Sequence, residues 1–120
     1  IDLSRVHLVG ASNGGMFVHY LAQELPGHFA GIAPVFGVPL LGYLNGAKDQ
    51  LVRDRDALSG TSVFSLHDRF DTNIPWQGGV TSYGWIYESL ERSMGAWAAA
   101  LFRHSMRREF FAPLHAASHR

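Results

Sequence analysis

The 120-residue chain contains no cysteine, which excludes disulfide bridges, thiolate metal sites and cysteine nucleophiles. This absence does not fix the redox compartment, because secreted proteins can also lack cysteine. An excess of charge of one sign is equally absent: ten Lys and Arg residues balance ten Asp and Glu residues. A neutral chain lacks the electrostatic footprint that phosphate backbones and anionic membranes attract. We therefore expect neither nucleic acid nor an anionic membrane surface as a partner.

Long apolar runs are missing as well. No segment approaches the roughly 20 apolar residues of a membrane span, and Ile1–Arg5 lacks the charged-then-apolar build of a signal peptide. We expect no membrane span, and the compartment stays open. The composition is that of a globular protein, because 47% hydrophobic and 17% charged residues exclude the profile of a disordered chain. At this length we expect one modest core and no second domain.

The first third of the chain predicts a strand, a helix and a second strand. Arg5–Gly10 has the β-branched and apolar character of a buried strand that ends at a glycine. Apolar residues at helical spacing from Gly14 onward predict a helix of about three turns, which Pro26 and Gly27 stop. Phe29–Gly37 is short and apolar, as a second buried strand would be. This order implies a right-handed parallel crossover.

The rest of the chain predicts one further strand and one further helix. Residues 38–60 indicate a long surface excursion, with a short helix around Asp49–Leu58. Ser62–Leu66 predicts a third strand, and residues 67–84 a polar, turn-forming loop after it. A stripe with steps of three and four residues then predicts a helix packed on the sheet: Ile86, Leu90, Met94, Trp97 and Leu101.

The predicted elements amount to a partial α/β domain over residues 1–102. Three parallel strands with two flanking helices leave the sheet edges exposed, which suggests a fragment of a larger fold. Residues 103–120 are locally basic and predict a loosely attached tail.

The sequence Gly10-Ala11-Ser12-Asn13-Gly14 matches the pattern G-x-S-x-G between a predicted strand and a predicted helix. This context favours a sharp turn in which small residues at Gly10 and Gly14 allow crowding of the backbone and Ser12 is exposed. The N-terminal N–H groups of the helix would point to the same place, so the backbone N–H of Asn13 could stabilise an oxyanion. The pattern predicts an acyl-transfer nucleophile.

Two other readings of this turn stay open. Ser12 could simply cap the helix. The glycines could instead form a dinucleotide-binding turn, although Met16 stands where the last glycine is required and no acidic residue ends the second strand.

A second polar segment, His67-Asp68-Arg69-Phe70-Asp71-Thr72-Asn73-Ile74-Pro75, follows the third strand. Together with Asp2–Val6, Gly10–Met16 and Ile32–Val35, it resembles α/β-hydrolase serine esterases of the polyhydroxybutyrate depolymerase and feruloyl esterase group. The resemblance extends to about Trp97 and implies a partial α/β-hydrolase fold.

The resemblance implies a Ser-His-Asp triad in which Ser12 is the nucleophile and Asp71 the acid that orients the histidine. Asp68 stands where the family has glycine and could compete for the role of the acid. His67 is expected to be a turn residue and not the base. Trp76 and Trp85 could line an apolar substrate surface or pack in the interior.

Two parts of the family's site are unmatched. The loop that supplies a second oxyanion N–H would precede Ile1, and no downstream histidine carries the family signature; His104, His115 and His119 are the histidines that the tail offers. We expect a carboxylic ester, small or polymeric, as substrate, and no metal or organic cofactor. A prolyl-oligopeptidase-like peptidase and a silent remnant that folds with another chain are the alternatives. Secretion is implied by the resemblance alone.

Overall fold

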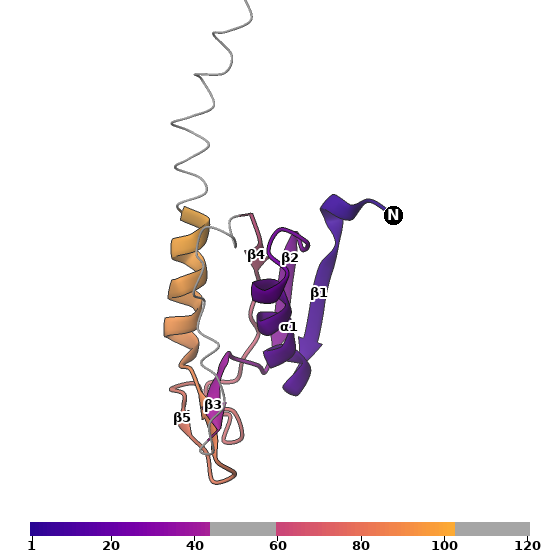
Figure 1. Cartoon of the computed structure of the whole chain (residues 1–120). Helices are drawn as coiled ribbons and strands as arrows, with labels where there is room; N and C mark the ends of the chain where they lie inside the picture. The colour runs from indigo at the N-terminus through magenta and orange to yellow at the C-terminus, as the bar shows by residue number, and fades with distance from the viewer. Residues whose placement is uncertain (44–59, 103–120) are drawn as a thin grey trace, which may run out of the picture.

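The computed structural model describes residues 1–43 and 60–102, which form a small mixed α/β fold (Figure 1). A short 3₁₀ helix, η1 (Leu3–Arg5), leads into strand β1 (His7–Ala11), and helix α1 (Asn13–Glu24) follows. The next elements along the chain are β2 (Gly31–Val35), β3 (Leu40–Tyr43), β4 (Ser62–Val63), β5 (Gly79–Val80) and β6 (Trp85–Tyr87). A second helix begins at residue 90 and continues through residue 102.

The main sheet consists of three parallel strands, as predicted, and their order is β1-β2-β4. The register pairs Leu8 with Ile32 and Ile32 with Val63, so these three side chains point to one face of the sheet. A further parallel bridge joins Val35 to Leu66 and extends the third segment beyond β4. The predicted three parallel strands and two flanking helices are therefore present.

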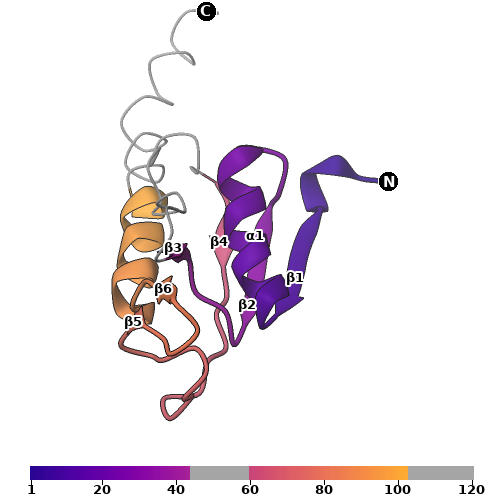
Figure 2. The same ribbon diagram turned by 60° about the horizontal axis from the view of Figure 1, so that its bottom comes forward.

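Helix α1 and the second helix pack on the same face of this sheet (Figure 2). The core between them combines residues from both helices and from β2: Val18, Ala22, Ile32, Trp97 and Ala100. Leu8 and Val63 pack against this cluster from the neighbouring strands. The alternation of side chains along β1 places Leu8 in this core and leaves Val9 on the opposite face.

The opposite face of the main sheet is open among the described residues. Val9 is 74% exposed, Phe64 70% and Leu66 52%. Strand β1 is also the end of the strand order, so no described strand pairs with its outer edge. Parallel sheets are normally covered on both faces, and this apolar face therefore departs from the usual arrangement.

A second, antiparallel sheet in the order β3-β6-β5 was not predicted. It lies beside the start of the second helix (Figure 2). The loop expected over residues 67–84 contains β5, and residues 38–43 contain β3 in place of a surface excursion. A tight turn at Gly84, whose φ is +85°, connects β5 to β6. These strands are only two to four residues long and depend on pairing across the chain, which sequence periodicity does not reveal.

The predicted helical stripe was wrong at its first member. Ile86 lies in β6, opposite Val80 of β5, whereas Leu90, Met94, Trp97 and Leu101 lie in the second helix. The physical reason is a cap: the Ser89 hydroxyl accepts a hydrogen bond of 3.2 Å from the Arg92 N–H, which starts the helix at residue 90.

A second cluster of buried apolar residues joins the antiparallel sheet to the loop after β4. It contains Val38, Ile74, Tyr87 and Leu90. The short helix expected at Asp49–Leu58 and the basic tail at 103–120 lie outside the described residues. In the described part of the chain, no helix is both long enough and apolar enough to cross a bilayer.

Candidate active site

Ser12 is the single residue between the end of β1 and the start of α1. Its backbone has φ 55° and ψ −119°, a conformation that residues with a Cβ rarely adopt. Among the described residues, only Phe36 shares a positive φ without being glycine. Such strain costs on the order of 1–3 kcal/mol and persists only where the surrounding structure imposes it. The predicted sharp turn from strand to helix is therefore present at Ser12.

Backbone hydrogen bonds hold this turn against the sheet. The Ser12 N–H donates to the Val35 carbonyl at 2.8 Å, and the Met16 N–H donates to the Ser12 carbonyl at 3.1 Å. The first bond fixes the turn to the carboxyl end of β2, and the second joins it to the first turn of α1. Ser12 is exposed, and its side chain makes no capping hydrogen bond to the helix. A hydroxyl whose purpose was to cap the helix would make that bond.

Three glycines allow α1 to approach the sheet closely at this point. A Cβ on Gly10 would overlap the carbonyl oxygen of Gly14, and one on Gly37 would lie 2.6 Å from the backbone of Gly15. A Cβ on Gly15 would lie 2.9 Å from the Gly37 Cα. Gly14 differs, because a Cβ there would meet nothing within 4 Å. The expectation that Gly14 must be small to make room for the turn was therefore wrong, and the requirement falls on Gly10, as expected, and on Gly15 and Gly37.

Asn13 is the first residue of α1. The first N–H groups of a helix have no acceptor within the helix, and the helix dipole favours negative charge beside them. The Asn13 N–H therefore lies directly after Ser12, at the end of α1 where negative charge is favoured.

Asp71 lies in the loop that follows the third parallel segment. The Phe36 N–H donates to the Leu66 carbonyl at 2.7 Å, so this segment pairs with the chain as far as the end of β2. On the other side of β2, the Ser12 N–H donates to the Val35 carbonyl. Ser12 and the loop containing Asp71 therefore both leave the sheet at the carboxyl ends of its parallel strands. The parallel topology thus brings the two sequence-predicted residues to one edge, with β2 between them.

The Asp71 carboxylate uses its two oxygens differently. Oδ1 accepts hydrogen bonds from the Asn73 N–H at 2.8 Å and the Ile74 N–H at 2.9 Å. Oδ2 lies 3.9 Å from the His67 Nε2, and the side chain is 16% exposed. Burial raises the pKa of the Tyr87 phenol, and the nearby Asp71 charge raises it further. Asp71 is therefore held by one oxygen, and the other oxygen is not committed to a backbone group.

Asp68 has a simpler environment. Its Oδ1 accepts one hydrogen bond, of 2.9 Å, from the Phe70 N–H, and the residue is exposed. Such a bond to the residue two positions later is a common turn device. Of the two aspartates, Asp71 is the one that the surrounding loop orients and partly buries.

His67 is enclosed by the same loop. Its side chain is 0% exposed, and Nε2 lies 2.7 Å from the Ile74 carbonyl oxygen. A carbonyl only accepts, so the imidazole donates from Nε2. The buried Nδ1 has no partner, and the ring packs edge-on against Trp76. This geometry ties the two ends of the Asp71 loop together and leaves no access for a substrate.

The other described histidines lie away from Ser12. His7 begins β1 and His28 precedes β2, so both are at the opposite end of the strands. His19 is buried between the helices and accepts a hydrogen bond of 3.1 Å at Nδ1 from the Trp97 indole. Burial lowers the pKa of His19 to about 4, and the nearby Gly37 backbone opposes this shift only in part. The buried His19 Nε2 has no hydrogen-bond partner among the described residues. His104, His115 and His119 lie outside the described residues.

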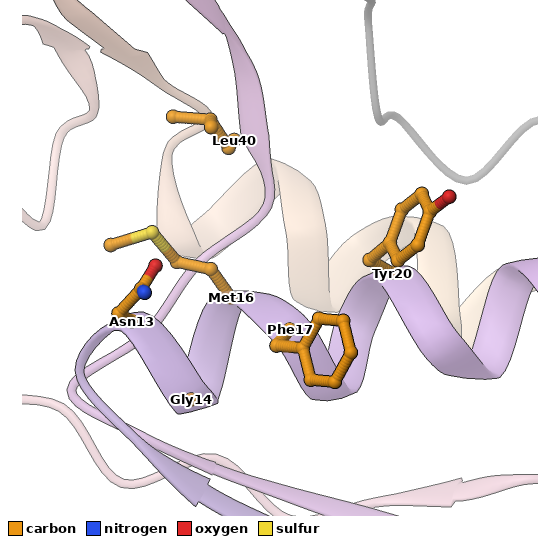
Figure 3. A pocket seen from close by; sticks show the side chains of 6 residues that line it. All are labelled: Asn13, Gly14, Met16, Phe17, Tyr20 and Leu40. Atoms are coloured by element: carbon orange, nitrogen blue, oxygen red, sulfur yellow. The ribbon is translucent and has the colours of Figure 1, made fainter.

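A groove of about 410 Å³ runs along α1 beside the turn (Figure 3). Its lining comes from α1 and β3: Asn13, Gly14, Met16, Phe17, Tyr20 and Leu40. The two tryptophans named above do not belong to it. Trp76 packs against the second cluster, and Trp85 is 41% exposed in β6. The sequence did not predict this groove, because the helical spacing of Phe17 indicated a buried helix face, whereas Phe17 is 54% exposed.

Within residues 1–43 and 60–102, no three His, Asp or Glu side chains gather as metal ligands would. Comparison with protein-family models gives no match, and comparisons with curated proteins and with solved structures give no significant similarity.

Proposed function

We propose that this chain carries the nucleophile and the orienting acid of a serine carboxylic ester hydrolase built on a partial α/β-hydrolase fold. The observation that carries the proposal is the backbone of Ser12, with φ 55° and ψ −119° and an exposed hydroxyl that caps nothing. Strain of this kind gathers at functional sites, because a structural turn would use glycine at no cost.

The chemistry follows from the position of each group. The Ser12 oxygen attacks the ester carbonyl and loses its proton to a histidine base, and the Asn13 N–H stabilises the oxyanion. Collapse of the tetrahedral intermediate breaks the ester C–O bond, the protonated histidine gives its proton to the departing alcohol, and Ser12 keeps the acyl group. Water then releases the carboxylic acid by the same steps in reverse order.

Asp71 fits the orienting role because its loop fixes the carboxylate through Oδ1 while leaving Oδ2 for an imidazole N–H. Its strand is separated from that of Ser12 by β2 alone, a distance of roughly 10 Å between strand axes. Two side chains that converge from the same edge can share one imidazole across such a gap. The base itself is a histidine from outside the described residues.

A hydrolase of this type forms an acyl-enzyme, which intact mass measurement detects. We expect 4-nitrophenyl acetate to add one acetyl group to the whole chain, located on the peptide that contains Ser12. Ser12→Ala should abolish the addition, whereas Ser82→Ala, which changes an exposed serine in the β5–β6 turn, should not. Acetylation confined to Lys48 and the N-terminal amine, unchanged in Ser12→Ala, would contradict the proposal.

One observation favours a second candidate, a catalytically silent module that is completed by another chain. The apolar face around Val9, Phe64 and Leu66 is uncovered, and the outer edge of β1 is unpaired among the described residues. A chain of this kind would stay unacetylated at Ser12 even in a sample whose amide spectrum shows a folded state.

A further inference from the structure

The groove along α1 carries an inference about the substrate, and it rests on the proposed function. It begins at Asn13 and Gly14, the two residues that directly follow Ser12. Figure 3 shows the Asn13 and Met16 side chains at one end, near Leu40, and Phe17 and Tyr20 farther along the helix. From Asn13 to Tyr20 is about 10 Å along the helix axis. The groove is thus elongated, and one end of it lies beside the nucleophile.

The lining of the groove is apolar apart from its ends. Met16, Phe17 and Leu40 supply hydrocarbon and a thioether, and the polar groups are the Asn13 amide and the Tyr20 hydroxyl. Phe17 is 54% exposed and Tyr20 38%, and their rings stack with centroids 6.2 Å apart. These two neighbouring aromatic side chains form an apolar surface that none of the residues in 1–43 and 60–102 covers fully. A volume of about 410 Å³ lies within the range of small-molecule sites.

We propose that this groove binds the unbranched aliphatic acyl chain of the substrate, with the carbonyl at the Asn13 end and the chain directed along Phe17 towards Tyr20. A flexible chain fits better than a rigid polar group, because the walls offer dispersion contacts and no hydrogen-bonding partner between the two ends. The product carboxylate would lie at the N-terminus of α1, where the helix dipole favours negative charge. Esters of medium-length acids are therefore the preferred class over acetate esters.

Binding of the product acids tests this assignment without requiring turnover. The whole chain is labelled with ¹³C at its methionine methyl groups and titrated with sodium acetate, hexanoate and octanoate. Met16 and Met94 both pack against the second apolar cluster, around Val38 and Tyr87, but only Met16 lines the groove. Met94 is therefore an internal control. We expect octanoate to shift the Met16 signal and not the Met94 signal. Octanoate should bind at least fourfold more tightly than hexanoate, a factor of about two for each methylene that the open groove half-buries.

A matched pair of variants locates the chain. Phe17→Ala should weaken octanoate binding about tenfold, the effect of losing one half-covered aromatic ring, and should leave the weak binding of acetate unchanged. Phe102→Ala removes a similarly exposed ring, 66% exposed on the second helix, and should change neither. Equal shifts of Met16 and Met94, or equal octanoate affinity in Phe17→Ala and the unaltered chain, would overturn the assignment. A concentration-dependent dimer that Phe17→Ala dissociates would also overturn it, because the groove would then belong to a second copy.

Ser12→Ala separates this inference from the proposed function. The variant should bind octanoate as the unaltered chain does, because the serine hydroxyl is not part of the groove lining. Chain-length-dependent binding by the unaltered chain, together with no acylation of its Ser12 by an acetyl or octanoyl ester, would support the groove and contradict the hydrolase. Acylation of Ser12 that is equally fast with acetyl and octanoyl esters would support the hydrolase and overturn the groove.

Discussion

The Ser12 N–H donates a 2.8 Å hydrogen bond to the Val35 carbonyl, and through it the strained turn after β1 is fastened to the end of β2. Val35 also bridges to Leu66, the residue before the loop that carries Asp71. One backbone position therefore connects the proposed nucleophile to the segment of the proposed acid.

Close packing at the turn predicts opposite effects for two adjacent glycines. Gly15→Ala places a methyl group 2.9 Å from the Gly37 Cα and should lower the free energy of unfolding by about 1–3 kcal/mol. Gly14→Ala meets open space inside a helix and should raise it by up to about 1 kcal/mol. Urea denaturation followed by tryptophan fluorescence measures both. Similar changes in the two variants would show that Gly15 is not at a close contact.

The strain at Ser12 predicts that glycine there stabilises the fold. Ser12→Gly should raise the free energy of unfolding by about 1 kcal/mol, because glycine tolerates φ 55° while losing somewhat more backbone entropy on folding. Ser82→Gly, at an exposed position with negative φ, should lower the stability instead. Destabilisation of equal size at both positions would remove the evidence for stored strain.

The structural role of the Asp71 carboxylate in its loop and its proposed role as the orienting acid can be separated by substitution. Asp71→Asn keeps an oxygen for the Asn73 and Ile74 N–H groups and should change stability little, yet it should slow acylation of Ser12 by about 10²–10⁴-fold. Asp71→Ala leaves both N–H groups without their acceptor and should also cost about 1–3 kcal/mol in the free energy of unfolding. Asp68→Asn is the control and should leave acylation within a few-fold. A larger rate loss in Asp68→Asn than in Asp71→Asn would exchange their roles.

His19 predicts a loss of stability on mild acidification. Its pKa is lowered by burial from 6.5 to about 4, so the unfolded chain binds a proton between these pH values that the folded chain does not. The contribution of neutral His19 to the free energy of unfolding is fully present above pH 6.5. It falls by about 3 kcal/mol as the pH approaches 4. Denaturation curves at pH 7, 5.5 and 4.5 measure this slope.

His19→Gln is the matched variant for that experiment, because its side-chain oxygen can still accept the Trp97 indole N–H. Subtracting its pH profile removes the titration of the carboxylates, which both proteins share. Parallel profiles for the two proteins would mean that His19 does not titrate differently in the folded and unfolded chains.

The sequence predicted the parallel part of the fold because its signals are local. The glycine after β1, the helical spacing within α1 and the Pro26-Gly27 stop each act within a few residues, and the crossover rule supplies the rest. The antiparallel sheet was missed because Leu40 and Tyr87 pair across the chain in strands too short for a periodic signal. Ile86 was wrongly predicted to be helical because its four-residue step to Leu90 fits a helix. Ser89 lies between the two residues and caps the helix, so Ile86 belongs to the strand before it.

The site was predictable to the same extent. The positions of Ser12 and Asp71 at one edge follow from a motif in its required context and from parallel topology. The partners of Asp71 did not follow, because the bonds from Asn73 and Ile74 depend on how the loop folds over the cluster around Tyr87. The contact between Gly15 and Gly37 joins positions 22 residues apart and could not be inferred from either one.

The most direct test of the central claim is covalent labelling of the whole chain by an alkyl fluorophosphonate at pH 7, with the modified residue located by peptide mass mapping. The account predicts a single phosphonylated residue, Ser12, and loss of the label in Ser12→Ala but not in Ser82→Ala. A folded sample that remains unlabelled at Ser12, or that is labelled equally at several exposed serines, would contradict it.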